Sequence, residues 1–281
     1  MLKKGYTRMK RRINEGVVLR KNGDECPDLT MGSTKRNEER LWGRCFRPRG
    51  NPLFRRDRMN HRCKICGGET CAFTQEKFQV TYHQCVVCEF IFRDPLEILS
   101  KEEEYAIYEG HENALEDKGY VAYLNRFIQG AVLPFVGPSK EGLDYGSGPS
   151  PVLAKILQRD HGYTMDLYDL FYAPEKVFLS KRYDLITSVE VVEHFTDPMR
   201  EFRWMKDALK TGGVLAIQTQ LHPKDWALFK NWYYMRDPSH VAFYTTDTFV
   251  KLGEMLGLRL IYTDEVRYVV FRKEGPPVSV D

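Results

Sequence analysis

The sequence has no long hydrophobic run. Among its 281 residues, no stretch approaches the roughly 18 uninterrupted apolar residues that a membrane-spanning helix requires. Its basic, polar start also lacks the apolar core of a secretory signal. Seven cysteines are an odd number in a chain of this length, which argues against a secreted scaffold held by disulfides. These absences predict a cytoplasmic protein that does not contact a membrane.

The first part of the chain has little acidic charge. Residues 1–60 hold 17 Lys and Arg against 7 Asp and Glu, a net charge of +10, whereas the remainder carries −7. The basic segment also lacks a sustained period of 3.6 or 2, so we expect it to be disordered. It could be a nucleic-acid-binding arm, a targeting peptide or a dispensable tail with translation starting at Met59. We favour the dispensable tail.

Four of the cysteines form two pairs, Cys63-x-x-Cys66 and Cys85-x-x-Cys88, with 18 residues between them. Two cysteines on one tight turn direct both thiolates at a single point, and a second such turn completes a tetrahedral zinc site. Apolar residues alternate between and after the pairs, so residues 61–95 are typical of a zinc ribbon. Because four thiolates leave no open coordination position, a bound zinc ion would be structural.

Neighbouring side chains leave the exact ligand set open. Cys71, His61 and His83 could replace one of the four cysteines, although we favour the four. Cys26 and Cys45 are expected to be unligated. Four incidental buried cysteines are the alternative, which two correctly spaced pairs make less favourable.

The rest of the chain alternates between strand and helix patterns. Residues 100–137 read as helical, and Tyr105, Tyr108 and His111 could either cover a ligand as a lid or lie on a solvated helix. From 138 to 281 the alternation predicts a mostly parallel, doubly wound α/β sheet. A helix capped by Thr196 is expected to end at Gly212. Strands are expected at residues 142–145, 164–168, 183–189, 214–219, 258–263 and 267–272.

A glycine turn follows the first of these strands. Gly146 and Gly148 allow the backbone to turn sharply and approach a ligand closely. The sixth position of the turn is Pro151, which argues against the third glycine of a pyrophosphate-binding fingerprint. Asp169, 25 residues after Asp144, could accept hydrogen bonds from both hydroxyls of a ribose. Together these residues indicate a nucleoside cofactor without a pyrophosphate.

Three segments resemble motifs of class I S-adenosylmethionine-dependent methyltransferases. Residues 144–150 look like the first motif, and residues 183–198 resemble the fourth-strand motif of the branch with a Glu-His pair. Residues 209–217 are similar to the Gly-Gly turn and fifth strand, and the resemblance covers about 100–273. It implies a Rossmann-like sheet of seven strands with the last antiparallel. It also implies cofactor contacts from Asp144, Tyr145, Gly146, Gly148, Pro149, Asp169, Leu170, Ser188 and Glu190.

The chain departs from that pattern in two places. Ser150 stands where many members have a third glycine, and the short span from Asp169 to Tyr183 leaves little room for the usual third strand. A zinc ribbon joined to such a domain resembles both ribosomal RNA guanine methyltransferases and sugar C-methyltransferases. Neither resemblance is close enough to assign the acceptor.

The catalytic candidates follow the fourth and fifth strands. Glu193 and His194 lie where ligands bind in such sheets, and His194 could accept a proton, or the two could form a structural pair. The aromatic-rich segment 226–244 could be a substrate wall or hydrophobic core. Within this segment we favour His240 as the functional residue.

These features predict a methyltransferase that uses S-adenosylmethionine and carries a structural Zn²⁺. The acidic main body and aromatic segment favour a small-molecule acceptor, and no obligate protein partner is evident. An RNA methyltransferase that grips phosphates with its ribbon is one alternative, although residues 61–95 hold few clustered basic side chains. A non-catalytic binding protein with a remnant fold is another, and the retained Asp144, Gly146, Gly148 and Asp169 argue against it.

Overall fold

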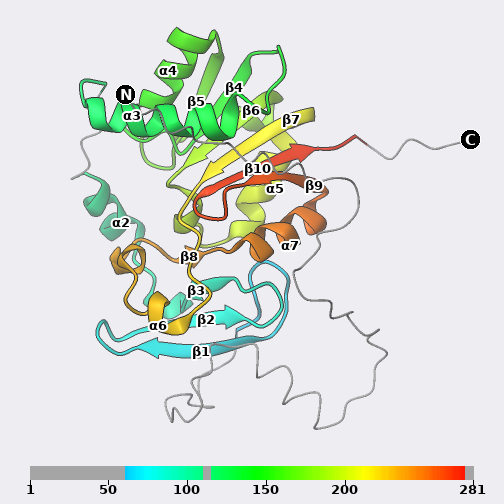
Figure 1. Cartoon of the computed structure of the whole chain (residues 1–281). Coiled ribbons are helices and arrows are strands. Elements are labelled where there is room, and N and C mark those ends of the chain that lie inside the picture. Colours follow the sequence, from blue (N-terminus) through cyan, green and yellow to red (C-terminus); the bar gives the residue numbers. More distant parts are fainter. Residues whose placement is uncertain (1–60, 110–114, 276–281) are drawn as a thin grey trace, which may run out of the picture.

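The computed structural model describes residues 61–109 and 115–275, which form two sheets (Figure 1). The predicted basic tail lies outside the described residues, as do Cys26, Cys45 and His111. No helix in the described ranges combines the length and apolar character that crossing a membrane requires.

The larger sheet has six strands, in the order β5-β4-β6-β7-β10-β9. Strands β5, β4, β6 and β7 are parallel neighbours, and β10 is antiparallel to both β7 and β9. The mostly parallel fold with an antiparallel last strand is therefore confirmed. The strands are β4 (Glu141–Tyr145), β5 (Thr164–Tyr168), β6 (Tyr183–Val189), β7 (Leu209–Gln218), β9 (Leu258–Thr263) and β10 (Tyr268–Lys273).

The expected count of seven strands is wrong for the described residues, because the third strand of the pattern is absent. The connection at residues 170–182 contains turns and the short helix η3 (Val177–Leu179) instead. A crossover between parallel strands needs a dozen or more residues, so this span cannot hold a strand and two connections. Phe178 is buried there, with its ring centroid 5.4 Å from that of Tyr145 and 4.9 Å from that of Tyr168.

Helices cover both faces of the larger sheet. Side chains of α3 (Lys118–Phe127) and α4 (Val152–His161) pack with Leu185 and Ala216 on one face. Side chains of α5 (Pro198–Ala208) and α7 (Thr246–Leu256) pack on the other face, together with residues of the cysteine-rich segment. Each face therefore buries one layer of helices, as a doubly wound sheet requires.

Two local expectations about α5 are wrong. Its N-cap is Asp197, whose side chain accepts from the backbone N–H of Arg200, and not Thr196. The helix ends at Ala208, and Gly212, with a φ of 80°, lies inside the long strand β7. Helix α7 has Thr245 as its N-cap and Gly257 as its C-cap.

The smaller sheet is antiparallel and has the order β1-β2-β3-β8. Strands β1 (Thr70–Gln75), β2 (Val80–Cys85) and β3 (Ile91–Arg93) come from the segment predicted to be a ribbon. The fourth strand, β8 (Ala242–Phe243), comes from beyond β7 and lies beside β3 in Figure 1. The ribbon and the larger sheet therefore share a core, which includes Cys63, Cys85 and Phe92.

Candidate functional site

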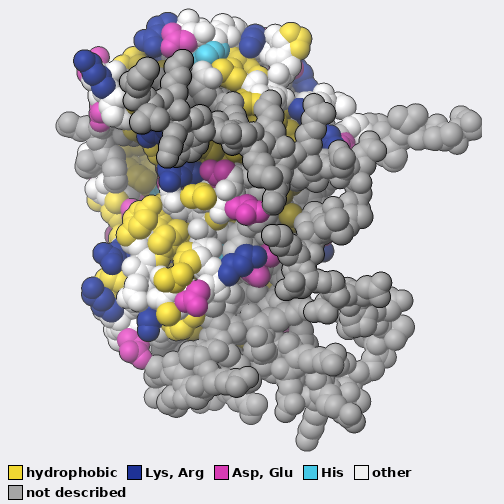
Figure 2. Space-filling view, in the orientation of Figure 1, with side chains coloured by type: hydrophobic (Ala, Val, Ile, Leu, Met, Phe, Trp, Pro, Cys, Tyr) yellow, Lys and Arg dark blue, Asp and Glu magenta, His cyan; other side chains and the backbone are white. Residues whose placement is uncertain are grey.

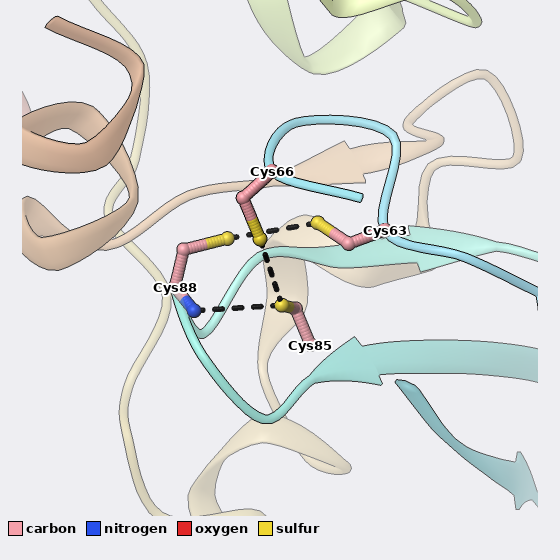
Figure 3. A group of neighbouring side chains, drawn as sticks. All are labelled: Cys63, Cys66, Cys85 and Cys88. Carbon is pink, nitrogen blue, oxygen red and sulfur yellow. Dashed lines mark hydrogen bonds between the residues drawn. The ribbon is translucent and has the colours of Figure 1, made fainter. Parts of the chain in front are cut away.

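The four paired cysteines converge on one point (Figure 3). Their sulfurs lie within 4.8 Å of one another, with 3.6 Å between Cys63 and Cys88 and 3.4 Å between Cys66 and Cys85. Zn–S bonds of about 2.3 Å in a tetrahedron place sulfurs about 3.8 Å apart. All four thiols are free of disulfides. The donor set and its spacing therefore fit a zinc ion.

The backbone supports the same arrangement. The N–H groups of Val87 and Cys88 each point at the Cys85 sulfur from 3.4 Å. A Cβ added at Gly68 would lie 3.2 Å from the Cys66 sulfur and 3.0 Å from a Val87 methyl, so a side chain there would crowd the cluster. Hydrogen bonds with the neighbouring thiols lower the pKa of Cys85 to about 2, against the effect of burial, whereas such hydrogen bonds and burial both raise the pKa of Cys88.

The alternative ligands lie outside this cluster. Cys71 is buried on β1, opposite Gln84. His83 is buried on β2 and pairs with Asp94 at 2.9 Å, and the His61 ring lies 4.7 Å from the His83 ring. His61, His83 and Asp94 form a separate group with potential ligand atoms within 4.8 Å of one another.

A second site lies at the carboxyl ends of β4, β5 and β6, where a cavity of about 550 Å³ opens. The glycine turn after β4 forms part of its wall. Gly146 has a φ of 91°, and a Cβ added there would lie 2.2 Å from a Val191 methyl. Gly148 has a φ of 64° and open space beside its Cα. The turn thus presents bare backbone to the cavity.

Most of the predicted cofactor residues line this cavity. They are Tyr145, Gly146, Gly148, Pro149, Asp169, Leu170 and Glu190. Asp144 and Ser188 are buried outside the lining. Burial raises the pKa of Asp144 to about 7, although the Thr187 hydroxyl donates to it at 2.9 Å. The Ser188 hydroxyl has no hydrogen-bond partner in the part of the chain that the structure describes.

Asp169 joins the two loops that frame the cavity. Its Oδ2 accepts from the Gly148 N–H at 2.9 Å, and its Oδ1 accepts from the N–H groups of Phe171 and Tyr172 at 2.9 and 3.1 Å. A carboxylate has about four acceptor positions, so it can accept from ligand hydroxyls as well. This is the chemistry expected of a ribose contact.

Helix α2 (Lys101–Tyr108) packs against the loop after β5. The Tyr105 ring lies 5.4 Å from that of Phe171, and the Tyr108 ring lies 5.4 Å from that of His194. Tyr108 lines the cavity, as do Lys101 and Glu104 of the same helix. The position of this helix therefore favours the lid over a separate solvated helix.

His194 and His240 line another part of the cavity, the histidine corner. His194 Nδ1 lies 3.1 Å from the Ser239 carbonyl oxygen, and His240 Nδ1 lies 2.6 Å from the Tyr234 carbonyl oxygen. A carbonyl only accepts, so Nδ1 carries the proton in both neutral rings and Nε2 does not. The two ring centroids are 4.8 Å apart. Burial lowers the pKa of His240, which favours its neutral form.

Glu193 lies behind this corner and does not line the cavity. Its side chain is fully buried, accepts from the Thr219 hydroxyl at 2.9 Å and hydrogen-bonds the Tyr234 hydroxyl. Burial, and then the charge of Glu190, raise the pKa of Glu193 well above its usual value. Its Oε1 is 4.0 Å from His194 Nε2. The potential ligand atoms of Glu193, His194 and His240 lie within 4.8 Å of one another, so this corner could also hold a cation.

The carboxyl groups of Glu190 and Glu193 both hydrogen-bond the hydroxyl of Tyr234. The Tyr234 hydroxyl contacts Glu190 at 2.8 Å as well as Glu193, yet it has a single proton to donate. A proton on Glu193 satisfies both contacts, with Glu193 donating to Tyr234 and Tyr234 donating to Glu190. Tyr123 also donates to Glu190, at 2.6 Å. Glu190 has a φ of 53°, a left-handed conformation that this network holds in place.

The aromatic segment at residues 226–244 is mostly core and not a substrate wall. The Phe73 ring lies 4.4 Å from that of Trp226, and the Tyr82 ring lies 5.8 Å from that of Phe229. In the orientation of Figure 1, hydrophobic side chains gather on the surface where α2 and α6 (Trp226–Phe229) lie, as Figure 2 shows. Of the segment, Asp237 and His240 line the cavity.

Sequence reasoning missed the residues that support this corner. The carboxyls of Glu190 and Glu193 are contacted by four residues that lie far from them in the chain: Tyr123 of α3, Tyr234, Gln218 and Thr219. Thr219 and Gln218 could have been found, because they end the strand beside β6. Nothing local marks Tyr123 or Tyr234 among the many tyrosines of the chain.

Comparisons with known proteins place this architecture among methyltransferases. A family model described as a methyltransferase domain matches residues 120–263. The ubiquinone biosynthesis O-methyltransferase of Dinoroseobacter shibae is 30% identical over 131 residues, which cover 44% of this chain and 52% of that protein. The chain therefore spans about half the length of this curated relative.

Solved structures are more distant. An O-methyltransferase family protein from Burkholderia thailandensis matches with a TM-score of 0.44 and 14% identity, over 63% of both chains. CalO1, a methyltransferase in calicheamicin biosynthesis with S-adenosylhomocysteine bound, has a TM-score of 0.43 and 16% identity. That match covers 61% of this chain and 58% of CalO1.

Proposed function

We propose that this chain, which belongs to the methyltransferase-domain family, is an S-adenosylmethionine-dependent methyltransferase that methylates an oxygen of a small molecule, with His194 as the base. The observation that carries the proposal is the hydrogen bond of His194 Nδ1 to the Ser239 carbonyl, at 3.1 Å, on the wall of the cavity that the glycine turn also lines. The ring is thereby held in the tautomer whose Nε2 can accept a proton. The name of the curated relative, an O-methyltransferase, supports oxygen as the acceptor atom.

The residues around the glycine turn would hold the methyl donor. Gly146 and Gly148 let the backbone approach it, and Asp169 would accept from its ribose hydroxyls. Leu170 and Glu190 line the same cavity, whereas Asp144 would fix the turn from behind. When bound, S-adenosylmethionine supplies a methyl group on a sulfonium, which is transferred in line to a nucleophile.

His194 would remove the proton of the acceptor hydroxyl as its oxygen forms the new bond to the methyl carbon. The carbon–sulfur bond breaks with its electron pair on sulfur, and the proton moves to His194 Nε2. Asp237 and His240 line the cavity at the same corner and would orient the acceptor. Protonated His194 would then be stabilised by the negative charge of Asp237, which interacts electrostatically with His194.

The four cysteines would hold a structural zinc ion, as their geometry and four-thiolate chemistry suggest. We do not favour RNA as the acceptor. Phe73 and Tyr82 of the ribbon pack against the segment at residues 226–244, so this face is not available to stack on bases. Location in the cytoplasm stays a prediction from the sequence.

The test begins with the full chain and two ligands. Calorimetric titration with S-adenosylmethionine and S-adenosylhomocysteine, and a zinc assay on the same sample, should give binding and about one zinc ion per chain. A panel of phenols and other hydroxylated small molecules is then assayed with a labelled methyl donor. Absence of cofactor binding in a folded, zinc-containing sample would contradict the proposal.

The role of His194 is tested with a matched pair of variants. His194→Gln should bind S-adenosylhomocysteine normally but transfer methyl groups about 10²–10⁴-fold more slowly, the usual contribution of a general base. His161→Gln, on the outer end of α4, should behave like the parent enzyme. A rate retained by His194→Gln would show that another group, or no group, accepts the proton.

A further inference from the structure

The segment at residues 238–241 connects the smaller sheet to the histidine corner. The carbonyl of Ser239 accepts from His194 Nδ1 at 3.1 Å. The backbone N–H of Val241 donates to the Glu193 carbonyl at 2.9 Å. The position of this segment therefore decides how the His194 ring faces the cavity and which of its nitrogens carries the proton.

Arg93 contacts both ends of the segment. Its backbone N–H donates to the Val241 carbonyl at 2.9 Å, and its Nη1 donates to the Pro238 carbonyl at 2.5 Å. The ring of Pro238 fixes its φ, which restricts the movement of the carbonyl that Arg93 contacts. The next carbonyl along the chain is the one that orients His194.

Arg93 is buried although it is a cation. Its side chain is 9% exposed, and the guanidinium forms no ion pair among residues 61–109 and 115–275. Its Nε is also buried without a hydrogen-bond partner there. A buried cation without a carboxylate is costly, so its contact with the Pro238 carbonyl must offset that cost or serve a function.

We propose that Arg93 is a positioning residue, which holds the segment at residues 238–241 so that the Ser239 carbonyl keeps His194 in the Nδ1-protonated tautomer. Arg93 does not line the cavity, so it acts through Ser239 and not on the acceptor. This inference rests on the proposed role of His194 as the base. It makes the ribbon a contributor to the acceptor side of the active site.

The cysteine cluster is connected to Arg93 through strand β3. Arg93 ends β3, which begins directly after the turn that carries Cys88, and the Cys85 N–H donates to the Phe90 carbonyl at 2.8 Å across that turn. Tyr82 of β2 lies opposite Arg93. A metal-filled turn would therefore fix the register of β3, and through it the position of Arg93.

The experiment reads the His194 tautomer directly, so it needs no known acceptor. Full-length chain labelled with ¹⁵N-histidine is saturated with S-adenosylhomocysteine, and long-range ¹H–¹⁵N spectra are assigned with His194→Gln. Arg93→Met, which keeps the length and loses the donor, is compared with Arg93→Lys, which keeps one donor. Arg272→Met is the matched control, because Arg272 donates to the Phe135 carbonyl at 2.8 Å on the far strand β10.

The parent chain and Arg272→Met should show His194 protonated on Nδ1. In Arg93→Met this signal should give way to a mixture of tautomers, and Arg93→Lys should restore much of it. The dissociation constant for S-adenosylhomocysteine should stay within about twofold, because Arg93 is outside the cavity.

An unchanged His194 signal in folded Arg93→Met would overturn the inference. If that variant does not fold, Arg93→Gln, which is polar but too short to reach Pro238, is judged by the same criterion. Failure of the parent chain to bind S-adenosylhomocysteine would instead count against the proposed function. The His194 tautomer is then compared between the parent chain and Arg93→Met without the ligand, and the same criterion applies.

Discussion

Asp169→Asn removes a negative charge at the point where the two cavity loops meet, and it should weaken cofactor binding strongly. The amide keeps one oxygen for the N–H groups of Phe171 and Tyr172, which lie 2.9 and 3.1 Å from Oδ1. Its NH₂ group then faces the Gly148 N–H, which now donates to Oδ2 at 2.9 Å. Two donors would oppose each other, and the acceptor for the ribose would be lost.

The magnitude follows from the number of contacts. A hydrogen bond to a charged group contributes about 1.5–3 kcal/mol, so losing one of them should raise the dissociation constant about 10- to 200-fold. Titration calorimetry with S-adenosylhomocysteine measures this change. Asp166→Asn is the control, because Asp166 lies on β5, the strand that leads to Asp169, but pairs with Lys181 at 2.7 Å.

An unchanged affinity in folded Asp169→Asn would refute the assignment of the ribose to this carboxylate. A loss of affinity in both variants would instead indicate that β5 itself is disturbed. Thermal unfolding of each variant separates these cases, since only a disturbed strand should lower the melting temperature of both.

Three further predictions concern stability and the glycine turn. Burial raises the folded-state pKa of Asp144 to about 7, so the folded chain holds this proton more tightly, and stability falls as pH rises from about 4 to 7. Asp144→Asn should therefore stabilise the chain by about 1–4 kcal/mol at pH 8 and not at pH 4, as measured by denaturation at both values. Cys88→Ala should remove the zinc and lower the melting temperature of the whole protein by about 10 °C or more, because Cys88 lies in the shared core. A separate low-temperature transition in calorimetry would contradict that coupling. Gly146→Ala should destabilise far more than Gly148→Ala, because its Cβ would lie 2.2 Å from a Val191 methyl, and Val191→Ala should partly rescue it in the double variant.

Local signals in the sequence were enough to find the four clustered cysteines and the glycine turn. In both, a few adjacent residues determine the geometry: Cys63 and Cys66 share one turn, and Gly146 and Gly148 both have positive φ. Helix α5 was misplaced at both ends because adjacent residues compete. Asp197 can cap as well as Thr196, and a glycine pair can lie within a strand as well as end a helix.

Contacts between distant segments were not predictable in the same way. Strand β8 has two residues, and only its pairing with β3 identifies it as a strand. The aromatic segment gave equal support to a substrate wall and to core, since the deciding fact is the ribbon sheet that covers it. The boundaries of the predicted domains at residues 95, 100 and 137 stay predictions.

The pairing of β3 with β8 also has a consequence for the order of events during synthesis. Ile91 pairs with Phe243, so the ribbon leaves the ribosome long before its fourth strand exists. Until then β3 has an open edge, with unpaired backbone groups next to the apolar side chains of Phe90 and Phe92. Folding of the ribbon and of the larger sheet must therefore finish together, and a chain that stops before residue 242 leaves an edge that can pair with another molecule.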